Sequence, residues 1–223
     1  MILRESEWYR DVIRSRVKPG SLVLNIGSST KYVAEVKQPY IKKNVLDELT
    51  AKGCIVKNID IKKSDGVDIV GNINDLQFAH QLRDMKPDVI MCANTLEHIE
   101  DRQTFCKGLE FILGDQTILL ISVPHTFPYH EDPIDTMYRT DVAGLTREFP
   151  SLCLVEGSVL KMKYFSVIAE NYSTLGKLWF FIKQVMKCML LIFVFQWKDA
   201  GDVGWSFRTI YETCAVYERR PNI

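Results

Sequence analysis

The stretch SLVLNIGSST, residues 21–30, decides the fold class. A short apolar run occupies 21–26 after the break at Lys18-Pro19-Gly20, and small or hydroxylated residues follow it at 27–30. An apolar run of this length is typical of a strand buried on both faces of a parallel sheet. The stretch therefore predicts a buried strand over 21–26 that runs directly into a tight turn.

Working outward, six more strands are predicted, and helical patterns separate most of them. The strands are expected at 54–59, 67–70, 89–93, 117–123, from 152 and at 211–219, and the expected helix caps are Asn44, Asp75, Asp101 and either Thr140 or Asp141. Strands that alternate with helices at this spacing indicate an α/β fold with a doubly wound, mostly parallel seven-stranded sheet and helices on both faces. Ligands of such sheets lie beyond the carboxyl ends of the strands.

Length and composition limit the class of protein. The chain has 223 residues, which suits one domain over 1–223, and its 28 Lys and Arg balance 28 Asp and Glu. Zero net charge argues against nucleic acid as a partner. The six cysteines lack zinc-type spacing and predict a reducing compartment. Residues 1–18 are predicted to form an amphipathic helix and not a leader, and the expected location is cytoplasmic.

The segment 161–205 is apolar and basic, and it is predicted as a helical insertion before the last strand. Between 175 and 198 the polar side chains, Gln196 excepted, fall within an arc of roughly 120°. Lys183 and Lys187 leave only 188–195 uninterrupted, which is short of the roughly 20 residues of a membrane span. Two coverings stay open for the apolar face: the inner face of a membrane, bound peripherally, or protein, either this domain or a homodimer mate.

The turn after the first strand also limits the cofactor. A dinucleotide fingerprint requires GxGxxG, whereas Gly27 stands alone before Ser28-Ser29-Thr30. No phosphate-binding loop with its lysine occurs in the chain either. These absences disfavour a nicotinamide-dependent oxidoreductase and a nucleotide triphosphatase.

Five short motifs, each placed after a predicted strand, carry a resemblance to a known family. They are VLNIGSST at 23–30, IDI at 59–61, GNIND at 71–75, PDVIMCANTLEHIED at 87–101 and SVPHTFPYHEDPIDTMYRT at 122–140. In this order they resemble class I, Rossmann-like methyltransferases that depend on S-adenosylmethionine. The last motif is similar to the PYHxxPxDxxR loop of a subgroup that often accompanies bacterial surface-polysaccharide biosynthesis.

The resemblance implies S-adenosyl-L-methionine as the cofactor. In the family the first turn holds the methionyl part, an acidic residue after the second strand binds the ribose, and the next turn contacts adenine. The cofactor-binding residues implied on this chain are Asn25, Gly27, Ser28, Asp60, Ile61, Asn72, Ile73, Asn94 and Leu96. The chain departs from the family at Asn25, where an acidic residue is usual, and in a turn with fewer glycines.

The loop after the fifth strand is expected to cover the acceptor. A hydroxyl acceptor must lose its proton during attack, and imidazole suits this role near neutral pH. His130 is the first candidate, with Asp135 and His98 as further catalytic residues and His125 in reserve. Tyr129, Arg139 and His125 are the expected substrate contacts. The alternative is a structural loop in which Asp135 and Arg139 pair with each other.

The same loop is also rich in side chains that can bind a metal. His125, His130, Glu131, Asp132 and Asp135 fall within eleven positions. The loop is rich in proline and has no histidine pair at i, i+4, so no metal is predicted. The sequence as a whole predicts methyl transfer to a small or glycan-like acceptor at oxygen. The alternative is a non-catalytic module of the same fold that binds S-adenosylmethionine or a partner, which Asn25 favours.

Overall fold

A computed structural model describes residues 1–130, 134–169, 173–194 and 205–220 of the chain. It divides into two compact units. One comprises residues 1–125, 129–160 and 212–223, and the other comprises residues 126–128 and 161–211. The first unit contains every predicted cofactor-binding, catalytic and substrate-contacting residue.

The sheet has seven strands in the order β3-β2-β1-β4-β5-β7-β6. Their bounds are β1 Leu22–Ile26, β2 Ile55–Asp60, β3 Ile69–Val70, β4 Val89–Ala93, β5 Ile118–Thr126, β6 Leu152–Lys163 and β7 Thr209–Arg219. The pairs from β3 through β5 are parallel, and β6 and β7 form the one antiparallel hairpin. The predicted doubly wound, mostly parallel seven-stranded sheet is therefore confirmed. The strand order reverses between β1 and β4, which is where ligands of such sheets bind.

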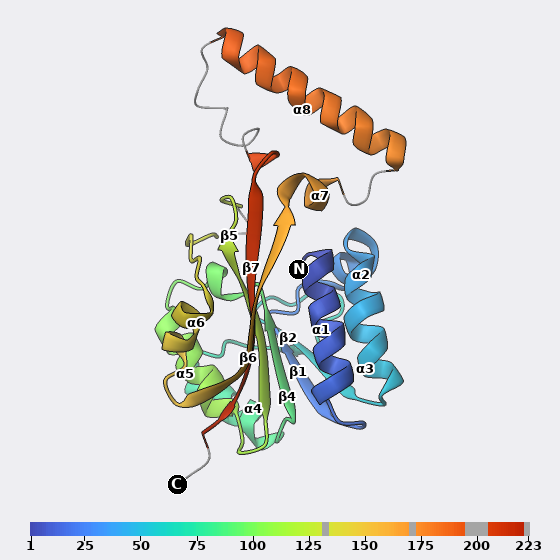
Figure 1. Cartoon of the computed structure of the whole chain (residues 1–223). Helices are drawn as coiled ribbons and strands as arrows, with labels where there is room; N and C mark the ends of the chain where they lie inside the picture. Colours follow the sequence, from blue (N-terminus) through green and yellow to red (C-terminus); the bar gives the residue numbers. More distant parts are fainter. Residues whose placement is uncertain (131–133, 170–172, 195–204, 221–223) are drawn as a thin grey trace. The chain divides into compact units, whose positions relative to one another are not determined.

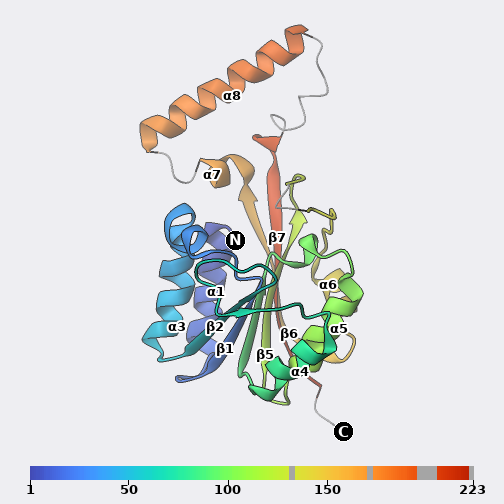
Figure 2. The same ribbon diagram turned by 180° about the vertical axis from the view of Figure 1, so that it is seen from behind.

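Helices cover both faces of the sheet, as the two opposite views show (Figures 1 and 2). One face carries α1 (Leu3–Arg16), α2 (Pro39–Ile41) and α3 (Asp47–Ala51), and the other carries α4 (Leu76–Asp84), α5 (Arg102–Ile112) and α6 (Val142–Glu148). Each face has its own buried apolar cluster. Leu24, Ile90 and Leu119 point toward the α4–α5 side, while their neighbours Val23, Val89 and Leu120 point toward α1. The alternation follows from the two-residue period of a strand.

Three predicted helix caps are present. The side chain of Asp75 accepts a hydrogen bond from the N–H of Gln77, Asp101 from Thr104 and Asp141 from Gly144. Each bond satisfies one of the backbone donors left over at a helix start. Of the two caps proposed for α6, the structure selects Asp141.

The prediction that Asn44 caps a helix is wrong. Helical backbone begins already at Val33 and, apart from a bend at Gln38, runs through two π-helical turns to Ala51. Asn44 lies inside this stretch, buried, and its amide donates to the hydroxyl oxygen of Ser6 in α1 at 2.9 Å. Asn44 therefore makes a contact with α1 and does not cap a helix, which is the role that the local pattern predicted.

The second unit contains α7 (Tyr164–Ile168) and α8 (Thr174–Val194). A helix thus runs through Val194 in the segment 175–198, and residues 195–198 lie outside the described part. Several of its apolar side chains are exposed, Leu178 to 58% and Met186 to 64%. Within the described residues, no helix has the length and apolar character needed to cross a membrane.

Candidate functional site

The turn after β1 is shaped by a close approach to the turn after β4. Gly27 has φ +71°, and a Cβ at this position would lie 2.3 Å from Oγ1 of Thr95. The N–H groups of Gly27 and Ser28 both donate to the carbonyl of Ile59, at 2.9 and 3.2 Å. Only glycine fits such a position, because the backbone is left-handed and the space for a side chain is filled. The carboxyl ends of β1, β2 and β4 meet here.

Two buried polar atoms at these strand ends have no hydrogen-bond partner among the described residues. They are Oγ of Ser28, after β1, and Oδ1 of Asn94, after β4. Buried polar atoms are nearly always paired, so an unpaired one indicates a missing ligand or water. The backbone is also strained nearby, since Ser29 and Asn94 have φ of 58° and 48°. Such strain in non-glycine residues is concentrated at functional sites.

Asp60 ends β2 beside this turn. Its carboxylate accepts hydrogen bonds from the backbone N–H of Ser29 at 3.2 Å and of Lys62 at 3.0 Å. Each carboxylate oxygen retains capacity for a further donor, so the side chain can still bind a hydroxyl. Asn25 lies differently, because its amide nitrogen donates to Oδ1 of Asn58 across the β1–β2 pair at 2.9 Å.

The other predicted cofactor residues divide by burial. Ile61 and Asn72 are exposed next to β2 and β3. Ile73, 4% exposed, and Leu96, fully buried, belong to the apolar core under α4 and α5. Their side chains are therefore part of the core.

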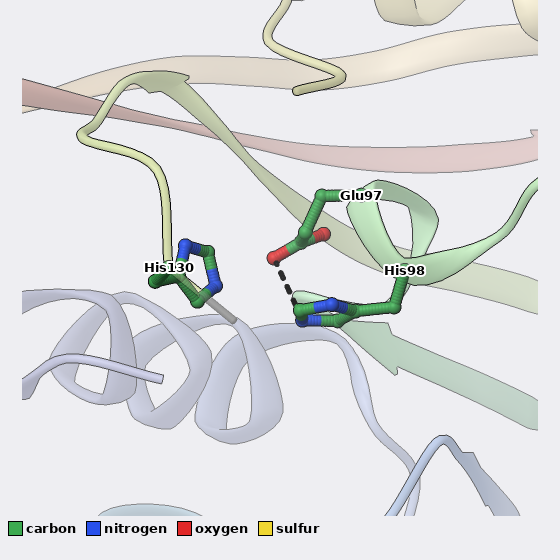
Figure 3. A group of neighbouring side chains, drawn as sticks. All are labelled: Glu97, His98 and His130. Atoms are coloured by element: carbon green, nitrogen blue, oxygen red, sulfur yellow. Dashed lines mark ion pairs between the residues drawn. The ribbon is translucent and has the colours of Figure 1, made fainter. Parts of the chain in front are cut away.

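A second group of side chains gathers after β4 and β5. Glu97 and His98 stand on a short 3-10 helix, Leu96–His98, and His130 stands on the loop after β5. The three side chains point toward one another (Figure 3), and their ligand-type atoms all lie within 4.8 Å of each other. Burial raises the pKa of Glu97 to about 8. The catalytic candidates His98 and His130 are thus brought together, with ring centroids 5.3 Å apart.

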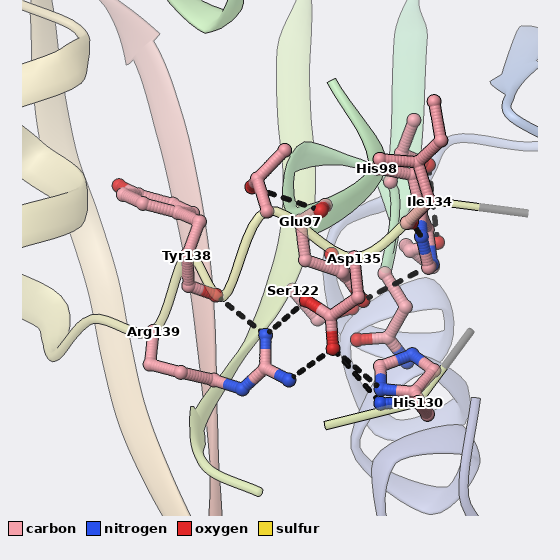
Figure 4. Close-up of polar contacts among 12 residues, drawn as sticks. Glu97, His98, Ser122, His130, Ile134, Asp135, Tyr138 and Arg139 are labelled. Carbon is pink, nitrogen blue, oxygen red and sulfur yellow. Dashed lines mark hydrogen bonds and ion pairs between the residues drawn. The ribbon is translucent and has the colours of Figure 1, made fainter. Parts of the chain in front are cut away.

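Asp135 ties the loop to this group. It lies between His130 and Arg139 (Figure 4) and accepts two bonds from the Arg139 guanidinium, at 2.7 and 3.1 Å. Oδ2 of Asp135 is also 3.3 Å from Nδ1 of His130. Burial by itself would raise the pKa of Asp135, but bonds from Arg139 and from the N–H groups of His130 and Met137 outweigh it and lower the pKa to about 2. The Asp135–Arg139 pair that the sequence left open is present.

The loop is fastened to the 3-10 helix through the backbone. The N–H and the hydroxyl of Thr136 both donate to the carbonyl of Glu97, at 2.8 and 3.0 Å, and Nδ1 of His98 contacts the carbonyl of Ile134. Of the expected substrate contacts, Tyr129 is exposed and His125 is half-buried. Glu131 and Asp132 lie outside the described residues.

Sequence reasoning missed the role of two buried glutamates. Glu97 was quoted within a motif but assigned no role, although it directly precedes His98. Glu5 in α1 reaches the strand ends, where Asn94 donates to it at 3.0 and 3.2 Å and Ser122 at 2.5 Å. A charged residue on the apolar side of the first helix was the available signal for Glu5.

Comparisons with known proteins find structures of similar fold but no match at the level of sequence. A scan against protein-family models finds no match, and a search of curated proteins finds none. Among solved structures, coclaurine N-methyltransferase bound to N-methylheliamine and SAH is similar with a TM-score of 0.58 and 14% identity, over 97% of this chain and 70% of that one. A methyltransferase structure from Bacillus halodurans gives a TM-score of 0.56 and 10% identity, over 96% and 99%.

A further similar structure is described by another reaction. The [4+2]-cyclase SpnF gives a TM-score of 0.54 and 9% identity, over 99% of this chain and 81% of that one. At such identities the likeness concerns the fold, and one fold can host different chemistries. The chain therefore has the Rossmann-like fold of the class I S-adenosylmethionine-dependent methyltransferases.

Proposed function

We propose that the protein transfers a methyl group from S-adenosyl-L-methionine to a small acceptor. The observation that carries this proposal is the pair of unsatisfied buried atoms, Ser28 Oγ and Asn94 Oδ1, at the reversal point between β1 and β4. A ligand with hydrogen-bond donors at that point would satisfy both oxygens, and the cofactor's hydroxyl and ammonium groups are such donors.

Different residues of the chain fit different parts of the cofactor. Gly27 keeps the first turn free of a side chain, and Ser28 and Asn94 offer oxygen acceptors. Asp60 offers a carboxylate for the ribose hydroxyls, while Ile61 and Asn72 are exposed where an adenine would lie. When bound, the cofactor supplies an electrophilic methyl group on a sulfonium. The protein contributes mainly by positioning, because in-line displacement depends on alignment of the reacting atoms.

The acceptor end of the proposed site is the cluster of Glu97, His98, His130 and Asp135. In this proposal His130 takes the proton of an acceptor hydroxyl, which the neighbouring Asp135 carboxylate supports because it would stabilise the resulting imidazolium. We therefore propose methylation at oxygen. A glycan-like acceptor, of the kind used in polysaccharide biosynthesis, is supported by the PYHxxPxDxxR pattern of this loop.

A second candidate function is binding without catalysis, by a module of the same fold. The observation that favours it is the Asn25–Asn58 bond, which engages the side chain that stands where the methyltransferase family usually has an acid. Calorimetric titration with S-adenosylmethionine, followed by an assay for its demethylated product, separates binding from turnover.

The experiment that tests the proposal is substitution of Asp60. We expect Asp60→Ala to weaken binding of S-adenosylmethionine by one to two orders of magnitude, about 1.4–2.8 kcal/mol, because charge-assisted hydrogen bonds to the ribose are lost. Isothermal titration calorimetry measures the change, and Asp84→Ala on α4 is the matched control. An unchanged affinity in folded Asp60→Ala removes Asp60 from the site, and no binding by the parent chain overturns the proposed function.

A further inference from the structure

The cluster of Glu97, His98 and His130 has the chemistry of a metal site. Among the described residues, these three side chains are the ones of the His, Cys, Asp and Glu types that could together hold a metal ion. Their potential ligand atoms all lie within 4.8 Å of one another. The members of the cluster come from two loops, at the ends of the neighbouring strands β4 and β5 (Figure 3). Two imidazoles and one carboxylate are a ligand set that divalent transition metals favour.

The outer contacts of the two histidines fit this role. A carbonyl can only accept, so the contact between Nδ1 of His98 and the carbonyl of Ile134 places the ring proton on Nδ1. Nε2 of His98 then presents a lone pair, 3.8 Å from Oε1 of Glu97. Nδ1 of His130 lies 3.3 Å from Oδ2 of Asp135. Metal-bound histidines usually have the second ring nitrogen held by a backbone carbonyl or by a carboxylate; His98 has the carbonyl contact, and for His130 the Asp135 carboxylate is a neighbour at ion-pair distance.

Glu97 supplies an independent observation. Its side chain is 0% exposed, and neither carboxylate oxygen has a hydrogen bond from another described residue. A carboxyl buried in this way stays protonated unless a cation compensates its charge, and a bound metal ion is such a cation. The residue is also fixed in place, since its carbonyl holds Thr136 through two bonds. These bonds hold the backbone of Glu97, and its carboxylate points toward the two imidazoles (Figure 3).

We propose that Glu97, His98 and His130 bind a divalent transition-metal ion such as Zn²⁺. Three protein ligands leave a fourth position for an exogenous oxygen, as in catalytic zinc sites. Ligand bonds of about 2.0–2.2 Å require the three side chains to draw closer than they are here, which side-chain rotations can provide. Metal binding itself does not depend on the proposed reaction. Its role at the acceptor oxygen does: there the bound metal, and not a free His130 imidazole, would ease loss of that oxygen's proton, because His130 as a ligand has no lone pair left to accept it.

The test is metal binding by the full chain, measured without cofactor or acceptor. After removal of metal with a chelator, Zn²⁺ is titrated against a competing indicator, and Co²⁺ is added as a spectroscopic probe. We expect one ion per chain, a Co²⁺ spectrum of a four-coordinate site, and affinity at least a hundredfold weaker in Glu97→Gln and in His98→Ala. Asp135→Asn, which removes the charge beside His130 and also weakens the contact with Arg139, should weaken binding by about 10- to 100-fold.

Control variants and a folding check distinguish loss of metal binding from loss of structure. His80→Ala removes an exposed histidine of α4, which meets Phe111 edge to face, and should leave the affinity unchanged. Glu97→Gln is nearly isosteric, and circular dichroism checks that each variant is folded. No stoichiometric Zn²⁺ binding by the parent chain, or equal affinity in parent and Glu97→Gln, overturns the metal site. Titration with S-adenosylmethionine in the presence of chelator tests the proposed function separately.

Discussion

The imidazole of His130 lies between the Asp135 carboxylate and the ring of His98. We expect His130→Ala to lower turnover by about a hundredfold or more, since general acid–base groups typically contribute that much. Affinity for S-adenosylmethionine should stay close to that of the parent, because the cofactor residues lie at other strand ends. Release of S-adenosylhomocysteine with a panel of small hydroxylated acceptors measures the first effect, and calorimetry measures the second.

His80→Ala serves as the control for this prediction as well. If His130→Ala retains near-normal turnover on a true acceptor, neither proton removal nor metal binding by His130 contributes to the reaction. A loss confined to cofactor affinity would place His130 at the cofactor instead.

Glu212 in β7 is a buried carboxyl whose state should control stability. Burial, then the nearby carboxyls of Glu5 and Glu97, raise its pKa well above the usual value, against smaller opposite effects of the Met1 amino group and Arg139. A carboxyl with a raised pKa in the folded state binds more protons when folded than when unfolded. Stability is therefore lost as pH rises from the unfolded value of about 4.5 toward the raised pKa.

We expect Glu212→Gln to be more stable than the parent at neutral pH, with a difference that grows between pH 5 and pH 8. Urea unfolding at several pH values measures it. Glu218→Gln, on the exposed part of the same strand, should show no such trend. A difference that shrinks as pH rises would contradict the direction of the shift at Glu212.

At the scale of elements, α6 begins at a cap that the sequence predicted. Oδ1 of Asp141 accepts from the N–H of Gly144 at 2.7 Å, and the preceding carbonyl, of Thr140, accepts from Thr213 in β7. We expect Asp141→Ala to lower the free energy of unfolding by about 1 kcal/mol, the usual effect of losing such a cap. Chemical denaturation measures it against Asp115→Ala, an exposed turn substitution. Equal stability of the two variants would show that the cap contributes nothing.

Elements whose signals are local were predicted well. The apolar runs of β1 and β4 and the capping aspartates of α4, α5 and α6 are readable because strand and cap patterns span only a few residues. The stretch from Val33 to Ala51 was mispredicted at its start, because Asn44 is held by Ser6, a residue 38 positions away. Contacts at that sequence distance have no local pattern.

The candidate site shows the same difference between local patterns and contacts across the sequence. Its residues could be named, since each follows a predicted strand and parallel strands end on one side of a sheet. Their partners could not. The convergence of Glu97 with His130 depends on the bonds between Thr136 and Glu97, which join two loops. The expectation of no metal considered only ligand spacing along one segment.

At the scale of the whole molecule, α8 presents exposed apolar side chains beside basic ones. Lys183 packs its ammonium over the ring of Trp179 at 3.4 Å, while Leu178 and Met186 are exposed. We expect the parent chain either to bind anionic vesicles in a salt-sensitive way or to self-associate, and Leu178→Glu with Met186→Glu to abolish that attachment. Vesicle flotation and sedimentation velocity distinguish the two.

The same double variant should unfold at the parent's temperature, because exposed positions contribute little to stability. Lys177→Gln is the control for charge alone and should weaken vesicle binding only in part. A parent chain that neither binds vesicles nor self-associates would contradict the expectation that the apolar face of α8 is buried against lipid or protein.

The contact between Gly27 and Thr95 has a consequence for how these positions change over evolutionary time. A Cβ at 27 would meet Oγ1, Cγ2 and Cβ of Thr95 at 2.3, 2.9 and 3.2 Å. A side chain at 27 is therefore compatible with this fold only where residue 95 has already become glycine, and it would still have to adopt a left-handed backbone. Substitutions at positions 27 and 95, which are 68 residues apart, should therefore occur together.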